Sequence, residues 1–179
     1  MIDFHSFKMK ILFCNDSLYS EVPKRVLTKG LNAKILKISI PGSTVMELKL
    51  ALVYRIRAMK PPPKILLLSA GTNNASSPID SFYNETKKIL EFCVSSKILF
   101  LMLPIPYSKL ASDKKINEMN NLINQFSYYD FNLQYTNQDL SFDRLHLTDE
   151  CLKEKIKKIK IILNLSISNL KFGEEKWIE

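Results

Sequence analysis

Short apolar runs alternate along the chain with longer segments of helical periodicity. The apolar runs lie at about residues 9–14, 34–39, 64–69, 97–103 and 128–135. Continuous apolar runs of this length are typical of strands buried on both faces of a sheet. Helical spacing of apolar residues covers the segments between and after them, at 18–29, 43–59, 80–94, 113–127 and 148–164. The alternation predicts an α/β fold, in which a five-stranded parallel sheet lies between two layers of helices.

Polar loops follow the first four predicted strands. They read NDS, IPGST, SAGTNNASSP and PIPYS in chain order. Right-handed crossovers place the carboxyl ends of parallel strands at one edge of the sheet, and open α/β sheets bind their ligands outside that edge. We therefore expect the functional side chains in these loops.

Length and composition indicate a single domain. The 179 residues are 46% hydrophobic, enough for one core, so we expect residues 1–179 to form one unit with a loosely docked tail at about 166–179. No apolar run reaches the length of a membrane span. The N-terminal segment lacks the pattern of a signal peptide, and we expect an intracellular, cytoplasmic location.

The chain is basic, with 26 Lys and Arg against 18 Asp and Glu and a net charge of +8. Such a surface attracts nucleic acid, anionic membrane headgroups or acidic substrates. Much of the excess lies in CLKEKIKKIKIIL, whose periodicity separates an apolar face from a lysine face. Two interpretations remain open: a solvated amphipathic helix, or a surface that binds anions.

Three cysteines, Cys14, Cys93 and Cys151, are odd in number and far apart in apolar or amphipathic segments. This spacing argues against a disulfide framework and against a zinc site. We expect the cysteines to be core residues and the protein to need no metal or cofactor.

A serine and a histidine suggest acyl transfer. Ser17 follows the first predicted strand, and His146 follows Asp143 by three residues in SFDRLHLT. Ser17 as nucleophile, His146 as base and Asp143 as its orienting acid would form a catalytic triad. Structural roles are open too: Asp16 or Ser17 could cap the next helix, and His146 could belong to a loop before a helix capped by Thr148.

Acyl transfer also needs donors for the developing oxyanion. The backbone N–H groups of Ser17 and Gly42 and the side-chain amide of Asn73 all lie in the predicted edge loops. A residue without Cβ lets its backbone approach a ligand closely, although a turn glycine is the alternative explanation for Gly42.

Four blocks together resemble the signature blocks of the SGNH (GDSL-type) serine hydrolases. They are NDS near the N-terminus, PGST after the second strand, GTNN after the third and DRLHL near the C-terminus. The resemblance extends from Cys14 to Leu147, over most of the chain. It implies a flavodoxin-like αβα fold and ester or amide hydrolysis through an acyl-enzyme.

The resemblance also implies the roles of individual residues. Ser17, Gly42, Asn73 and His146 match the four family residues, and Asp143 completes the triad. We therefore expect an esterase that acts on acetyl, short acyl or lipid esters.

Two positions depart from the family pattern. Asn15 stands where the family usually has Gly, and we expect it to accept the left-handed conformation of a turn. Asn74 stands where the family usually has Asp, which removes a carboxylate expected to brace the loop. The segments ISIPGSTVMELK, LLLSAGTNN and DRLHLT are also similar to the esterase-like domains of some non-LTR retrotransposon proteins.

Two other classes of function compete with the esterase. A catalytically impaired module of the same fold would bind nucleic acid or anionic lipid through its basic surface, independently of Ser17. A flavodoxin-like or receiver-like signalling domain would share the β-α alternation. The third strand ends in LLLSAGTNN without a phosphoacceptor aspartate, and no Gly-rich phosphate loop or dinucleotide fingerprint occurs.

Overall fold

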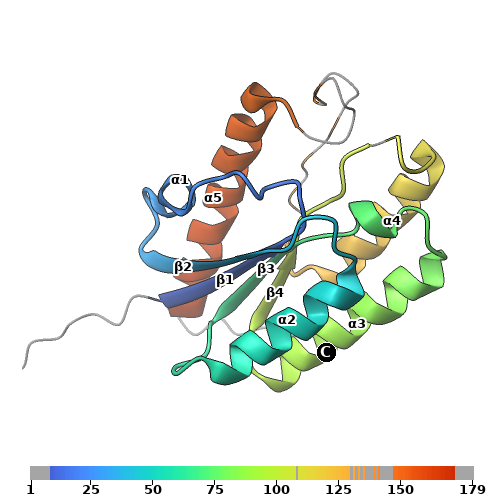
Figure 1. Ribbon diagram of the computed structural model, residues 1–179. Helices are drawn as coiled ribbons and strands as arrows, with labels where there is room; N and C mark the ends of the chain where they lie inside the picture. The colour runs from blue at the N-terminus through green and yellow to red at the C-terminus, as the bar shows by residue number, and fades with distance from the viewer. Residues whose placement is uncertain are drawn as a thin grey trace, which may run out of the picture.

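The protein forms a sheet with helices on both faces (Figure 1). The computed structural model describes residues 9–107, 109–129, 131, 133, 135, 139, 141 and 147–171. These residues contain four parallel strands, which confirms the α/β class. A fifth strand at 128–135 stays a prediction, because several of its residues lie outside the described part.

The strands are β1 (Met9–Asn15), β2 (Ala33–Ser39), β3 (Ile65–Ser69) and β4 (Leu99–Met102), in the spatial order β2-β1-β3-β4. The chain passes from β1 to the edge strand β2 and then returns across β1 to β3. The strand order therefore reverses between β1 and β3. In open α/β sheets, this switch point is where ligands bind, at the carboxyl ends of the strands.

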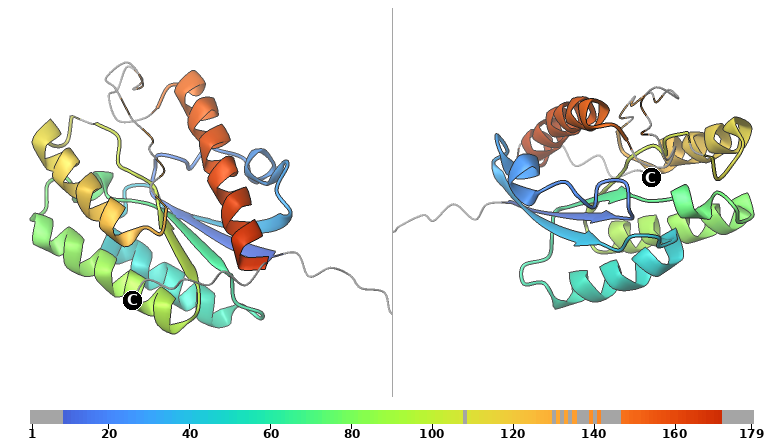
Figure 2. Two further views of the ribbon diagram at one scale, coloured as in Figure 1. Left: turned by 180° about the vertical axis from the view of Figure 1, so that it is seen from behind. Right: turned by 45° about the horizontal axis from the view of Figure 1, so that its top comes forward.

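Helices cover both faces of the sheet (Figure 2). On one face lie α2 (Val45–Ala58), α3 (Ile79–Ser95) and α4 (Asp113–Phe126), and on the other lie α1 (Lys24–Thr28) and α5 (Asp149–Lys171). Two apolar cores separate the three layers.

Strand alternation explains the two cores. In β1, Ile11 and Phe13 face the core under α1 and α5, whereas Leu12 and Cys14 face the core under α2, α3 and α4. All four side chains are fully buried. The continuous apolar run of this strand thus reflects burial on both faces.

Two helices differ from the sequence expectation. The helix expected at 18–29 begins only at Lys24, because the chain first makes turns closed by Ser20 N–H to Ser17 O (3.1 Å) and Val22 N–H to Tyr19 O (3.2 Å). The helix expected at 148–164 continues to Lys171, with Ser166 and Ile167 buried. The segment expected as a loose tail from residue 166 therefore begins as helix, and residues 172–179 lie outside the described part.

The helical periodicity of α5 follows the apolar pattern of its sequence. Ile156, Ile159 and Leu163 are buried against the sheet, whereas Lys153 and Lys157 are exposed. Within the described residues, none of the helices combines the length and the apolar character that crossing a membrane requires.

Candidate active site

Ser17 lies at a tight turn directly after β1. The Asp16 N–H donates to Ser69 O on β3 (3.0 Å), which continues the strand pairing one residue beyond β1. The Asp16 carboxylate then turns back and accepts the Leu18 N–H at Oδ1 (3.1 Å). Ser17 sits between these two anchored residues, half-buried at the carboxyl edge of the sheet.

Capping does not explain Ser17. The helix that follows begins at Lys24 with Pro23 as its N-cap residue, so Ser17 is several residues too early to cap it. The local cap in this turn is instead made by the Asp16 carboxylate. Helix formation therefore does not account for a serine at this half-buried position of the ligand edge.

Asn15 supports the turn differently from the expectation. It is the last residue of β1, paired with Ser39 and Ser69, and among the described non-glycine residues only Lys97 has a positive φ. The prediction of a left-handed Asn15 is therefore wrong. Its side-chain amide donates to Asp16 O (2.7 Å), and its Oδ1 accepts from the Ser39 hydroxyl (2.8 Å), which ties the first edge loop to the end of β2.

Gly42 forms the second edge loop. Its φ of +78° is in the left-handed region that favours glycine, and a Cβ built on it would meet no atom within 4 Å. The loop is closed by the Ser43 N–H and hydroxyl, which both donate to Ile40 O. Gly42 is exposed, so its backbone can be approached from solvent.

Asn73 connects the third edge loop to the second. It lies in a short 3-10 turn (Thr72–Asn74), and its Nδ2 donates to Ser43 O (3.0 Å). A side-chain amide carries two N–H donors. One N–H of Asn73 is therefore bound to Ser43 O, and this hydrogen bond orients the amide group that carries the second N–H.

Asn74 retains the brace that the substitution was expected to remove. Its Oδ1 accepts the Val45 N–H (2.9 Å), at the first residue of α2. This N–H is one of the unpaired donors at a helix N-terminus, and Asn74 is buried. An amide oxygen thus connects the third loop to α2 where a carboxylate was expected.

Asp143 and His146 lie outside the described residues, so their predicted roles stay predictions. Residues on either side of them in the chain are described. The Thr148 N–H donates a hydrogen bond to Asp139 O (2.8 Å). The Thr148 hydroxyl accepts the Cys151 N–H (3.3 Å), so Thr148 caps α5 as expected.

Leu147 packs in the same core as the residues that follow Ser17. Leu147, next to His146 in the chain, belongs to the core cluster that contains Leu18 and Tyr19. The Tyr19 and Tyr135 hydroxyls are hydrogen-bonded at 3.2 Å. Burial raises the pKa of both phenols well above the ordinary value, so both stay neutral and hold this contact at physiological pH.

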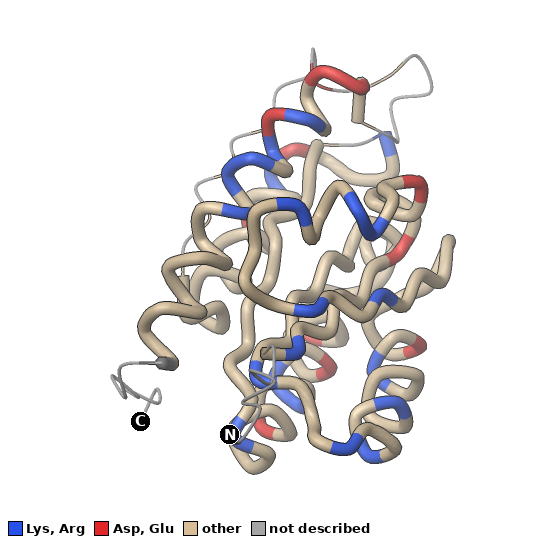
Figure 3. Tube along the Cα trace, turned by 90° about the vertical axis from the view of Figure 1, so that its left-hand side faces the viewer, with Lys and Arg blue, Asp and Glu red and all other residues tan. Residues whose placement is uncertain are grey.

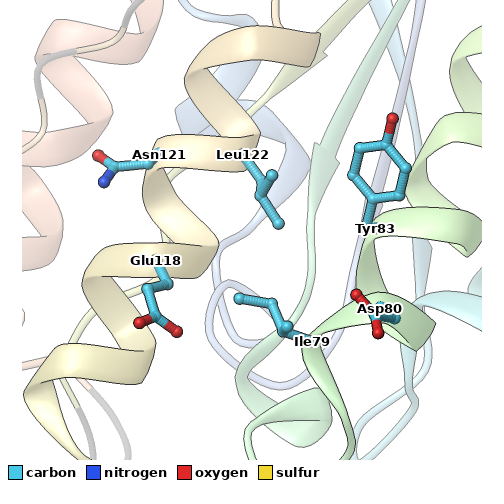
Figure 4. Close-up of a pocket in the computed structure, with 6 residues that line it drawn as sticks. All are labelled: Ile79, Asp80, Tyr83, Glu118, Asn121 and Leu122. Atoms are coloured by element: carbon cyan, nitrogen blue, oxygen red, sulfur yellow. The ribbon is translucent and has the colours of Figure 1, made fainter.

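A groove of about 520 Å³ lies outside this site, between α3 and α4 (Figure 4). Its lining residues are Ile79, Asp80, Tyr83, Glu118, Asn121 and Leu122. None of them belongs to the loops that carry Ser17, Gly42 and Asn73. The sequence alone favours residues 104–115 and the segment after Gly42 as the lining of an acyl or leaving-group pocket. The groove coincides with neither segment.

Metal ligands are the remaining chemistry that the site could supply. Within the part of the chain that the structure describes, no three His, Cys, Asp or Glu side chains form a group that could hold a metal ion. The expectation that no metal or cofactor is needed stays a prediction.

Comparisons with known proteins match the architecture rather than the sequence. No family sequence model matches the chain, and no curated protein sequence is significantly similar to it. Solved structures do match. A GDSL-like lipase from Bacteroides thetaiotaomicron has a TM-score of 0.73 at 16% identity, over 89% of this chain and 89% of its own.

Two further structures agree with it. The lipase/acylhydrolase from Enterococcus faecalis has a TM-score of 0.69 at 17% identity, over 86% of this chain and 96% of its own. The psychrotrophic esterase EstA from Pseudoalteromonas has a TM-score of 0.70 at 12% identity, over 89% of this chain and 99% of its own. From its architecture and these matches, this chain has the fold of the SGNH (GDSL-type) hydrolases.

Proposed function

We propose that the protein is a serine hydrolase that cleaves carboxylic esters through an acyl-enzyme. One observation carries the proposal: the loops of Ser17, Gly42 and Asn73 meet at the switch point of the sheet, tied together by the side chains of Asn15, Asn73 and Asn74. The similar structures of a GDSL-like lipase, a lipase/acylhydrolase and an esterase support this choice of reaction.

In the first half of the reaction, the Ser17 hydroxyl oxygen attacks the ester carbonyl while His146 takes the hydroxyl proton. Asp143 would orient the imidazole and stabilise its charged form. The carbonyl oxygen becomes an oxyanion, which accepts hydrogen bonds from Ser17 N–H, Gly42 N–H and the second Nδ2–H of Asn73. The C–O bond then breaks, the alcohol leaves with the proton from His146, and the acyl group remains on Ser17.

In the second half, water replaces the alcohol. His146 takes a proton from the water, the resulting hydroxide attacks the acyl carbon, and the same donors stabilise the second oxyanion. The ester bond to Ser17 breaks, and the proton on His146 returns to the serine oxygen. The products are a carboxylic acid and the regenerated enzyme.

The structure gives Asn73 a defined starting position for this role. Its bond to Ser43 O fixes the plane of the amide before substrate arrives. Donors that are already oriented need no reorganisation when the oxyanion forms, and one such donor is commonly worth about 10²–10³-fold in kcat. Asn73→Ala should therefore lower kcat by about this factor.

The substrate class is proposed only as an ester of an acetyl, short acyl or lipid group. The basic surface is proposed to make weak contacts with polyanions or anionic membrane surfaces. The narrower similarity to retrotransposon esterase-like domains stays a prediction from the sequence.

The test compares hydrolysis of p-nitrophenyl acetate, butyrate and octanoate by the wild type, Ser17→Ala, His146→Ala and Asp143→Ala. A fluorophosphonate probe should label Ser17, since the similar esterase EstA is described as inhibited by monoethylphosphonate. Ser76→Ala is the matched control, because Ser76 is an exposed serine in the third loop. We expect hydrolysis and labelling to vanish in Ser17→Ala and to persist in Ser76→Ala. A folded wild type that neither turns over nor reacts with the probe would contradict the proposal.

A further inference from the structure

Lys37 is a charged residue at an inward-facing position of β2. The strand alternates so that Ala33 and Ile35 belong to the core under α1 and α5, and Lys37 is next in that series and half-buried. Alternation of this kind normally continues with an apolar residue. A lysine here needs partners for its ammonium group, because burying an unpaired charge is costly.

The partners are backbone carbonyls of the segment that follows Ser17. Lys37 Nζ donates to Tyr19 O (2.7 Å), Ser20 O (2.6 Å) and Val22 O (2.9 Å). An ammonium group has three N–H donors and no acceptor. All three donors are therefore used, and all three bonds go to a stretch of four residues.

This contact reaches Ser17 through a single residue. Ser20 gives its carbonyl to Lys37, while its own N–H and hydroxyl both donate to Ser17 O, at 3.1 and 2.7 Å. The carbonyls that Lys37 binds are held toward β2, and regular helix begins only at Lys24. Lys37 thus holds the chain after Ser17 in turns.

We propose that Lys37 is a positioning residue for the nucleophile: it fixes the segment 19–22 and, through Ser20, the backbone of Ser17. The inference rests on the proposed role of Ser17. It adds a residue from another strand, in none of the four signature blocks, that acts through Ser20 rather than on the substrate.

A cation is required at this position for a physical reason. The negative ends of three carbonyl dipoles converge on one point, and a neutral side chain would leave them facing each other without compensation. Hydrogen bonds to a charged donor are roughly twice as strong as those between neutral groups. Burial lowers the pKa of the Lys37 ammonium, which agrees with a site that is partly shielded from water.

The test uses Lys37→Met, which keeps the length of the side chain and removes its charge and its donors. Misplacing a reacting group by about 1 Å can cost about 10²-fold, so we expect the rate of fluorophosphonate labelling at Ser17 and kcat to fall roughly 10-fold to 100-fold, with KM little changed. Lys34→Met is the matched control. It removes the same charge from the same strand, at an exposed position, and should react like the wild type.

Rescue separates positioning from a loss of folding. Lys37→Ala leaves a space at the carbonyls that methylammonium can enter, so added methylammonium should raise the labelling rate several-fold. Tetramethylammonium, which has no N–H donor, should not. Lys37→Arg should recover part of the rate, since it restores the charge and donors in another geometry.

The outcomes distinguish this inference from the proposed function. If wild type and Lys34→Met are both unreactive, the serine hydrolase itself is wrong. If both react and Lys37→Met reacts equally fast, the inference alone is overturned. A third outcome would also overturn the inference: folded Lys37→Met and Lys37→Ala are labelled slowly, methylammonium does not raise the rate of Lys37→Ala, and Lys37→Arg is labelled equally slowly. The defect would then not be the missing cation.

Discussion

At the scale of single residues, Gly42 and Gly30 offer a matched comparison. Both have a left-handed φ, +78° and +84°, and a Cβ would meet no atom within 4 Å at either position. Left-handed backbone costs about 1–2 kcal/mol for a residue with a Cβ. Gly42→Ala and Gly30→Ala should therefore each lower the free energy of unfolding by about 1 kcal/mol, measured by urea denaturation.

Activity should separate the two variants. A methyl group at residue 42 would lie beside the N–H that is proposed to bind the oxyanion, so Gly42→Ala should lower kcat/KM about 10-fold or more. Gly30 lies between α1 and β2, away from the edge loops, and Gly30→Ala should keep wild-type kcat/KM. Equal activity in both variants would argue against Gly42 as an oxyanion donor.

The cysteines give a second prediction at this scale. Burial raises the pKa of Cys14 and of Cys93 to about 12, and the thiolate is the form that reacts. Iodoacetamide at neutral pH should therefore leave both thiols unmodified in the native protein and leave ester hydrolysis unchanged, as mass spectrometry and a parallel assay would show. Protein unfolded in guanidinium should be modified at both. Inactivation that follows alkylation of Cys14 would implicate a thiol in place of Ser17.

At the scale of elements, Asn74 joins the third edge loop to the start of α2. Asn74→Ala removes the acceptor of the Val45 N–H and should cost about 1–2 kcal/mol of stability, as the loss of a helix cap does. Asn74→Asp keeps an acceptor and adds a negative charge at a helix N-terminus, which is favourable, so it should stay close to the wild type. Asn84→Ala, at an exposed position of α3, is the control. Equal thermal stability of Asn74→Ala and wild type would show that the hydrogen bond from Val45 N–H to Asn74 does not stabilise the fold.

The ion pair between Lys49 and Glu85 connects α2 to α3. Hydrogen bonds from Lys49 and then Lys88 hold the pKa of Glu85 below its ordinary value of 4.5. A lowered folded-state pKa means that the ionised form stabilises the fold above the unfolded value, and this contribution is lost as the pH falls through the folded value.

Glu85→Gln should therefore be less stable than the wild type by about 0.5–1 kcal/mol at pH 7. The difference should narrow as the pH falls below 4.5 and then through the lower folded-state pKa of Glu85, because the wild-type carboxyl then becomes protonated as well. Urea denaturation of both proteins between pH 7 and pH 3 measures this difference in the free energy of unfolding. Glu91→Gln, at an exposed position of the same helix, corrects for the general effect of one charge, and a difference for Glu85→Gln that did not change with pH would exclude the ion pair as its cause.

The sequence predicts the elements better than the contacts between them. Strand β1 lies within one residue of the expected 9–14, because its apolar run is set by burial on both faces. The helix after Ser17 begins later than its periodicity indicates, because turns closed by Ser17 O and Tyr19 O come first. Lys37, on the next strand, binds three carbonyls of the same segment. The strand ends predict the edge loops that carry Ser17, Gly42 and Asn73, and the family resemblance suggests the role of each residue. The support from Asn15 and Asn74 depends on side-chain directions that no local pattern contains.

At the scale of the whole molecule, exposed Lys and Arg occur on both helical layers, and one group of them lies on α1 and α5. Lys and Arg lie on both α1 and α5, which face the viewer together in Figure 3. The exposed basic residues on α1 and α5, or directly after α1, are Lys24, Arg25, Lys29, Lys153, Lys157 and Lys158. A grouped basic surface attracts anionic lipid headgroups, at about 1 kcal/mol for each Lys or Arg near the membrane. We expect vesicles of phosphatidylserine and phosphatidylcholine to bind the protein, and vesicles of phosphatidylcholine alone to bind it far less.

Two triple variants test whether vesicle binding depends on the basic residues of α1 and α5 or only on the net charge of +8. Lys29→Gln/Lys153→Gln/Lys157→Gln neutralises the α1 and α5 side, and Arg57→Gln/Lys87→Gln/Lys114→Gln neutralises exposed positions on the opposite helical layer. The first should weaken vesicle binding roughly 100-fold, since three contacts of about 1 kcal/mol are lost, and the second far less. Binding should also fall with added salt, because screening shortens the reach of each charge. It should be unchanged in Ser17→Ala, because the surface acts independently of the chemistry. An equal loss in both triple variants would show that net charge, and not an oriented surface, holds the protein at the membrane.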